Sequence, residues 1–306
     1  MHFILKLLAL ILMLAMLAIL VPDSALLPSA FGEAPSPTVK PVALEEDVVP
    51  LPLKGYGPYA PHRDCYAADG AGYHDSTLDI QVHTIRAFET TITVVYVQVA
   101  DASQLRTEQA KPYPSRTTVR TDVMAKRANA VLAINADYFV YHASGVIYRQ
   151  GKLLRDRANA EYDQLAIDDQ GDFHIASEGS DFLALEQPVI NSFCFGPALV
   201  VDGVKQPINT RKNFAPEKKT QRIGIAQVGK LTYMVVATEG PDERNSTGLT
   251  MEEFAQLMSD LGAGTAYNLD GGASTTVIFN GTKINAQKAL RIRAVSDIIY
   301  FATAEE

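Results

Sequence analysis

The sequence has few cysteines and histidines, and it lacks several motifs that would define common enzyme classes. Its two cysteines, Cys65 and Cys194, are too few for a zinc finger. Outside the cytoplasm they could form one disulfide, and two separate thiols are the other possibility. The six histidines show neither HExxH nor HxH spacing, and there is no GxSxG or P-loop motif. The sequence therefore gives no support to a zinc finger, a zincin-type metalloprotease, a nucleophile-elbow hydrolase or a P-loop NTPase.

Positive charge is also in short supply. The chain has 27 Lys and Arg against 35 Asp and Glu, which gives a formal net charge of −8. The basic residues form no stripe, and pairs such as Lys126-Arg127 are typical of a solvated surface. We therefore expect no nucleic acid among the partners of this protein.

One long apolar run lies at the N terminus. Residues 7–21 are wholly apolar and follow Lys6, and with the preceding residues the run approaches the roughly 18 residues of a membrane span. The small residues at 28–30 make a poor cleavage site. Residues 1–21 are therefore predicted to be a signal peptide or a membrane anchor. Because the positive charge precedes the run, the body is expected outside the cytoplasm, either secreted or held at the membrane through this segment.

Prolines recur through residues 22–61 and predict an extended, semi-rigid linker. The remaining residues, 62–306, number roughly 240, which is enough for one large domain or two small ones.

Short strands separated by turns dominate this body. The predicted strands cover 91–99, 131–134, 146–154, 164–167, 173–175, 198–201, 223–228, 231–238, 275–279 and 297–302. Helices are predicted only at 121–129 and 251–261, where Thr250 and Glu253 match a capping box. Many strands with few helices predict an α+β domain with mixed or mainly antiparallel sheets.

The most informative stretch is YNLDGGASTT at 267–276. In it Asp270 stands directly before Gly271 and Gly272, between a predicted helix and a predicted strand. Glycines let a backbone approach a ligand closely, and Ser274 follows within reach of the same turn. A purely structural turn capped by Asp would show the same pattern, so both interpretations stay open.

Other predicted strands also carry polar residues at their ends. These residues are Asn135, Asp137, Arg222, Glu239 and Asp242. Strand ends that meet at one edge of a sheet often form a catalytic site, although unrelated turns would give the same pattern. Taken singly, Asp137 and Asp242 are more typical of turn or surface positions.

The residue types have a shared chemical logic. Two carboxylates across a cleft can hydrolyse a glycosidic bond, one as acid and the other as base or nucleophile. An arginine fork suits a phosphate, and the backbone amides of 271–274 could form an anion-binding nest. Together they suit a glycan or sugar phosphate as substrate. Carboxylates with an asparagine could also hold a divalent cation.

At these residues the chain resembles the phosphodiester glycosidase family, from about residue 130 to residue 301. The similar segments are 133–139 (AINADYF), 195–200 (FGPALV), 222–225 (RIGI), 248–250 (GLT), 268–272 (NLDGG) and 293–297 (RAVSD). Several motifs in the right order are more specific than any one of them. The resemblance implies a single domain that acts as an extracytoplasmic hydrolase of glycosyl phosphodiesters in cell-envelope or exopolysaccharide material.

The candidate site residues follow from the motifs and the resemblance together. The candidate catalytic residues are Asp270, Glu239 and Asp137. The candidate substrate- and phosphate-binding residues are Asn135, Arg222, Gly271, Gly272, Ser274 and Arg293.

The chain departs from the family pattern at Ala136 and Ala273, where glycine is usual, and at Glu239, where aspartate is usual. These departures keep two alternatives open. One is a non-catalytic protein that binds anionic glycans. The other is a metal-dependent phosphodiesterase that cuts the phosphate side of the bond.

Overall fold

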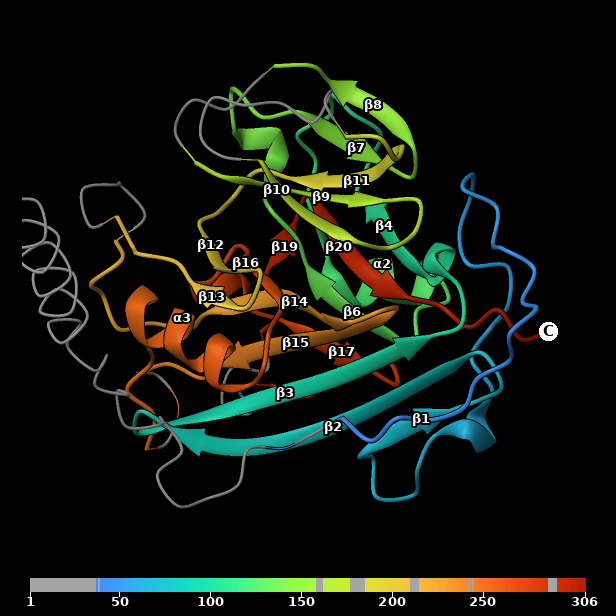
Figure 1. Cartoon of the computed structure of the whole chain (residues 1–306), viewed down its shortest axis with the longest axis horizontal. Helices are drawn as coiled ribbons and strands as arrows, with labels where there is room; N and C mark the ends of the chain where they lie inside the picture. Colours follow the sequence, from blue (N-terminus) through green and yellow to red (C-terminus); the bar gives the residue numbers. More distant parts are fainter. Residues whose placement is uncertain are drawn as a thin grey trace, which may run out of the picture.

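The computed structural model describes residues 37, 39–157, 162–176, 185–209, 215–241, 243, 245–285 and 291–306. In these residues two large antiparallel sheets enclose the main hydrophobic core, and each of two α-helices packs against one of them (Figure 1). The predicted fold class, an α+β domain of mainly antiparallel sheets with few helices, is confirmed.

The larger sheet has eight strands. Their order is β1 (Gly72–His74), β2 (Leu78–Ala87), β3 (Thr90–Val99), β15 (Thr232–Thr238), β14 (Ile223–Gly229), β16 (Thr265–Asn268), β12 (Ala198–Val201) and β13 (Val204–Lys205). In β3, Val95 and Val97 face the core between the sheets, whereas Val94 and Tyr96 face the side of α3 (Met251–Asp260). Because both faces of this strand are buried, its sequence alternates only in part.

The second large sheet has five strands. Their order is β18 (Thr282–Lys283), β17 (Val277–Phe279), β6 (Leu132–Asn135), β20 (Asp297–Phe301) and β4 (Leu105–Gln109). Its inner face contributes Ile134 and Phe301 to the shared core, and its outer face packs on α2 (Thr121–Arg127) through Ala133 and Tyr300. The chain therefore brings β6 and β16, which carry the candidate site, to neighbouring positions in two facing sheets.

The smaller elements complete the fold. A three-stranded sheet has the order β10 (Phe173–Ala176), β9 (Gln164–Asp168) and β11 (Val189–Phe193). Two strand pairs are formed by β7 (Ile147–Arg149) with β8 (Lys152–Arg155) and by β5 (Val119–Arg120) with β19 (Ala294–Val295). The 3₁₀ turns are η1 (Arg63–Cys65), η2 (Ala102–Gln104), η3 (Phe139–Tyr141) and η4 (Gly272–Ser274). Strands β7 to β11 lie together at the top of the view (Figure 1).

The start of α3 follows the sequence prediction. The Thr250 hydroxyl accepts a hydrogen bond from the Glu253 amide at 3.1 Å, and the Glu253 carboxylate accepts one from the Thr250 amide at 2.8 Å. This reciprocal pair satisfies two amides that the first helical turn would otherwise leave free. The predicted capping box is confirmed.

The described part of the predicted linker, residues 37 and 39–61, lies against the body. Leu51 is buried, and the Gln98 amide bonds both the carbonyl of Val42 at 2.7 Å and its N–H at 3.3 Å. Arg106 donates to the Pro52 carbonyl at 2.7 Å. This stretch is therefore held on the domain surface, so it does not act as a spacer that stands clear of the body.

The predicted signal peptide or anchor, residues 1–21, lies outside the described residues and stays a prediction. Within the described part of the chain, no helix has both the length and the apolar character needed to cross a membrane. Cys65 and Cys194 are both free thiols, so of the two possibilities left open by the sequence the disulfide is not formed.

Candidate active site

The turn that carries Asp270 follows strand β16, and the geometry requires glycine at each of its two Gly positions for a different reason. A Cβ on Gly271 would lie 2.8 Å from the Gln221 carbonyl oxygen, closer than a side chain tolerates. Gly272 has a φ of +58°, and its amide donates to the same carbonyl at 2.9 Å. Ala273 is exposed and belongs to η4, and neither it nor Ala136 has a positive φ. The two alanine departures therefore fall where a Cβ meets no backbone restriction.

Asn135 fixes both ends of this turn. Its side-chain N–H donates to the Asp270 carbonyl at 2.7 Å, and its carbonyl accepts from the Thr276 amide at 3.0 Å. The Asp270 amide in turn donates to the Ala136 carbonyl at 3.1 Å. Asn135 is fully buried, so its observed contacts are those of a residue that positions the turn from the facing strand β6.

Burial raises the pKa of the Asp270 carboxyl above its ordinary value. A hydrogen bond from Ser274 and the nearby charges of Arg293 and His142 lower it, whereas the charge of Asp137 raises it further. The balance leaves the pKa raised, so the ionised carboxylate is a stronger base than an exposed aspartate. A perturbed carboxyl that is also partly accessible is typical of a catalytic position.

A cleft of about 690 Å³ adjoins the turn and is lined by Gly272 and Ala273. Among the described residues, the charged side chains that line it are all positive: Arg120, Lys283, Arg291 and Arg293. Glu243 lies near enough to Lys283 to oppose the lowering of its pKa by burial. The balance of charge around this cleft favours an anion, and a phosphate fits both the size and the donors.

The sequence identified only Arg293 from this set. Arg120 joins the cleft because β5 pairs with β19, which places it opposite Ala294. A pairing between residues so distant in the chain leaves no local signal. Lys283 lies in β18, the second strand of the hairpin that turns at Asn280-Gly281, and Arg291 precedes β19. Neither position marked a site in the sequence.

Asp137 lies beneath the site and forms a buried ion-pair cluster. One Arg149 guanidinium nitrogen contacts the Asp137 carboxylate at 2.9 Å and the Asp297 carboxylate at 2.7 Å, and all three side chains are buried. The guanidinium also lies 4.7 Å from the ring centres of both Phe139 and Phe193. Burial is the main cause that raises the pKa of Asp297, to about 7.

Asp137 has further bonds that use its remaining oxygen positions. Its carboxylate accepts from the Cys194 amide at 2.8 Å and the Phe139 amide at 3.2 Å. A carboxylate that is fully buried and already bonded to Arg149 and two backbone amides cannot reach a substrate. We therefore assign Asp137 a positioning role in place of the expected catalytic one.

Arg222 is also committed within the protein. Its guanidinium donates to the carbonyls of Leu249 at 3.1 Å, Ala215 at 3.2 Å and Lys218 at 2.8 Å, and burial lowers its pKa to about 10. These contacts hold the segment before β14 against the start of α3. They favour a structural role over the expected contact with phosphate.

Glu239 follows β15, and its carboxylate accepts a hydrogen bond from Ser246 at 2.8 Å. Strand β14 separates β15 from β16, so the backbones of Glu239 and Asp270 are about 10 Å apart. Glu239 is partly exposed and stays the candidate second carboxylate. Asp242, the other carboxylate expected here, lies outside the described residues.

Among the described residues, a metal centre has no evident ligand set. In the described ranges, no three His, Cys, Asp or Glu side chains gather closely enough to hold an ion. The divalent cation considered from the sequence therefore has no assigned ligands.

The site as built combines a carboxylate of raised pKa with a cationic cleft and a rigid glycine turn. This arrangement is compatible in its chemistry with proton transfer to or from an anionic ligand. The chain belongs to the phosphodiester glycosidase family, whose model matches residues 128–302.

Two solved structures and one sequence relative are similar to this chain. The catalytic domain of zebrafish N-acetylglucosamine-1-phosphodiester alpha-N-acetylglucosaminidase, auto-inhibited by its pro-peptide, has a TM-score of 0.58 and 20% identity, over 85% of this chain and 99% of that one. A hypothetical protein from Synechocystis has a TM-score of 0.50 and 16% identity, over 73% and 62%. The SPbeta prophage-derived uncharacterized protein YomE of Bacillus subtilis is 29% identical over 192 residues, which are 60% of this chain and 30% of that protein. The chain thus matches less than a third of the length of this relative.

Proposed function

We propose that this protein hydrolyses glycosyl phosphodiesters at the bond between the sugar and the phosphate. The observation that carries the proposal is the position of Asp270, held by its glycine turn beside a cleft whose charged lining side chains are cationic. Family membership and the likeness to the zebrafish domain support the same reaction class.

The reaction divides between the two parts of the site. The phosphodiester lies in the cleft, where Arg293 and its neighbours stabilise the negative charge that the departing phosphate gains. Asp270 takes a proton from water, the water oxygen forms a bond to the anomeric carbon, and the bond from that carbon to the phosphate oxygen breaks. A phosphate is a good leaving group, so the more useful role for Asp270 is that of a base. Glu239 is the candidate second carboxylate.

We expect the substrate to be cell-envelope or exopolysaccharide material, and the body to lie outside the cytoplasm. Support for this location comes from residues 1–21, whose apolar run follows Lys6. Protease added to intact cells should degrade the body. Survival of the full chain in intact cells, with digestion only after lysis, would place the body in the cytoplasm.

The reaction is tested with purified protein and a panel of synthetic α-sugar-1-phosphodiesters that differ in the sugar. We expect free sugar and a phosphate monoester as products. Release of sugar phosphate and free alcohol, abolished by a chelator, would instead identify a metal-dependent phosphodiesterase. Binding without any product would identify the anionic-glycan binding protein.

Two arginines provide a matched test of the phosphate site. Replacing Arg293 by Ala should raise KM for the phosphodiester about tenfold, since a charge-assisted hydrogen bond is lost, while the melting temperature stays unchanged. Replacing Arg222 by Lys should leave KM close to wild type but lower the melting temperature, because a lysine cannot reach all three carbonyls. The reverse pattern would make Arg222 the phosphate ligand, as the sequence suggested.

A further inference from the structure

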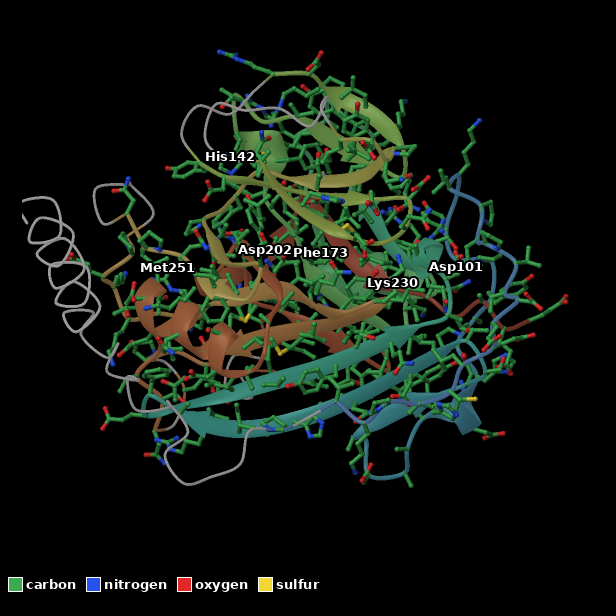
Figure 2. All side chains as sticks on the ribbon, in the orientation of Figure 1. Asp101, His142, Phe173, Asp202, Lys230 and Met251 are labelled. Carbon is green, nitrogen blue, oxygen red and sulfur yellow. The ribbon has the colours of Figure 1, made fainter. Side chains whose placement is uncertain are left out.

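A group of aromatic side chains lies beside the Asp270 turn and is used by none of the chemistry above. It consists of Tyr138, Tyr141, His142 and Phe195, and we call it the aromatic ledge. The rings of Tyr138 and Tyr141 are stacked, with centres 4.2 Å apart and an angle of 18°. The His142 ring meets Tyr138 at 6.2 Å and Phe195 at 6.0 Å, in both cases edge to face. Figure 2 labels His142 in the upper part of the molecule, to the left of strands β7 to β11.

Two hydrogen bonds, one from the Asp270 amide and one from the Asn268 side chain, tie both halves of the ledge to the end of strand β16. The Asp270 amide bonds the Ala136 carbonyl at 3.1 Å, only two residues before Tyr138. On the other side, the Asn268 side chain donates to the Gly196 carbonyl at 2.7 Å, directly after Phe195. Two residues span at most about 7 Å and a hydrogen-bonded backbone pair adds about 5 Å, so the Tyr138 and Asp270 backbones lie within about 12 Å of each other. The His142 ring is near enough for its charge to lower the pKa of Asp270.

The backbone of the ledge is held in an unfavourable conformation. Tyr138 has a φ of +61°, in the left-handed region that a bulky side chain rarely adopts. Hydrogen bonds on both sides of Tyr138 hold this conformation. The Tyr141 amide donates to the Tyr138 carbonyl at 3.1 Å, and the carboxylate of the preceding residue, Asp137, accepts from the amides of Phe139 and Cys194. Such strain gathers at sites where a side chain must point in one direction, and here it presents the Tyr138 ring to Tyr141.

The ledge differs chemically from the cleft. It is built from three phenyl-type rings and one imidazole, and Tyr141 is 43% exposed although it is large and aromatic. The His142 Nε2 atom is buried and has no hydrogen-bond partner among the described residues. An exposed aromatic ring next to an imidazole nitrogen that lacks a partner suits the C–H face of a pyranose and one of its hydroxyls.

We propose that the aromatic ledge is the glycosyl subsite, with the sugar ring against Tyr141 and a sugar hydroxyl bonded to His142. The inference rests on the proposed function, because it assigns the two halves of a glycosyl phosphodiester to two separate surfaces. The phosphate occupies the cationic cleft, the sugar occupies the ledge, and Asp270 lies where they meet.

The test is a crossed binding experiment that needs no turnover. Binding of methyl α-glucopyranoside, its N-acetylamino and galacto counterparts, and inorganic phosphate is measured by ligand-observed NMR titration of the full chain. Replacing Tyr141 by Ala should weaken binding of the best pyranoside about tenfold and leave phosphate binding unchanged. Replacing Arg293 by Ala should do the opposite.

Two further variants separate the ring from the hydroxyl and from exposure in general. Tyr141→Phe keeps the ring and loses only the hydrogen bond to the Arg116 carbonyl at 3.0 Å, so pyranoside binding should persist. Tyr56→Ala removes a tyrosine of equal exposure, 44%, that lies over Arg127 away from the site, and it should bind as wild type.

The outcomes distinguish the two proposals. If the wild type binds no pyranoside, or if Tyr141→Ala binds it as well as the wild type does, the ledge is not the glycosyl subsite. If the crossed pattern holds but the wild type releases no sugar from any phosphodiester, the subsite stands and the proposed hydrolysis fails.

Discussion

Replacing Asp270 by Asn should lower sugar release from a sugar-1-phosphodiester by about a hundredfold or more, as expected when general acid–base catalysis is removed. Asparagine keeps the shape of the side chain and can still bond Ser274, so the fold should be unaffected. The measurement pairs the turnover rate with a thermal melt for each variant. Asp202→Asn makes the same chemical change on the exposed turn between β12 and β13 and should have full activity (Figure 2).

The raised pKa of Asp270 gives this prediction a dependence on pH. A base must be ionised, so kcat/KM of the wild type should rise through the pKa of Asp270, at a higher pH than an ordinary aspartate would give. The folded state also binds this proton more tightly than the unfolded state, so its contribution to stability is present at low pH and is lost as pH rises through the folded pKa. The Asp270→Asn variant escapes that loss, so its melting temperature relative to wild type should increase from pH 4 to pH 8.

Three results would contradict the assignment or change it. A stable Asp270→Asn protein with wild-type turnover would exclude Asp270 from catalysis. Loss of activity together with a collapsed melt would favour the structural turn that the sequence also allowed. If Glu239→Gln loses as much turnover as Asp270→Asn while both variants melt normally, Glu239 takes part in the reaction. If the turnover of Glu239→Gln equals that of the wild type, the role of Glu239 is limited to its hydrogen bond with Ser246.

Replacing Arg149 by Met should destabilise the protein by about 3–5 kcal/mol, because it leaves the buried Asp137 and Asp297 carboxylates without a counter-charge. For a domain of this size the melting temperature should fall by roughly 10 °C. Arg120→Met is the control, since Arg120 is exposed and its ion pair with Asp122 contributes little. Equal melting temperatures for the two variants would show that the cluster is not important for stability.

The same variant should be sensitive to pH in a defined direction. Asp297 has a pKa of about 7 even with Arg149 in place. Without the guanidinium the pKa of Asp297 should be higher still. At pH 5 the Asp297 carboxyl is then protonated, so it no longer places an unpaired negative charge in the core. The stability lost in Arg149→Met should therefore be smaller at pH 5 than at pH 8.

Local signals in the sequence predicted much of the fold. The capping box at Thr250 places the start of α3 correctly, and the Asn280-Gly281 pair, which is typical of a type I′ turn, has a positive φ at both residues. These features depend on contacts between neighbours in the chain, which a sequence displays directly. Strand β2 was not predicted, because its exposed and buried residues alternate irregularly beside the edge strand β1.

The candidate site shows a different limit. The sequence can show that Asp137 or Arg222 stands at a strand end, but it does not show whether the bonds of that side chain are already used. Asp137 is committed to Arg149 and Arg222 to three carbonyls, partners that lie 12 or more residues away or on another element. Asp270, in contrast, carries its own evidence in the two glycines that follow it. Tertiary pairing brings Arg120 beside Arg293 in the cleft, and it brings Phe195 to the other rings of the ledge.

The contacts that hold residues 39–61 on the domain surface would limit how far the body can lie from a bilayer. If residues 1–21 remain as an anchor, residues 22–37, about 16 in all, separate it from the first contact with the body among the described residues. In that contact the Tyr96 hydroxyl donates to the Pro37 carbonyl at 2.8 Å. Even fully extended, about 16 residues reach only about 55 Å, against about 140 Å for the whole proline-rich stretch. Such a short tether would confine the active site to glycans close to the membrane surface and leave the outer polymer layers beyond its range.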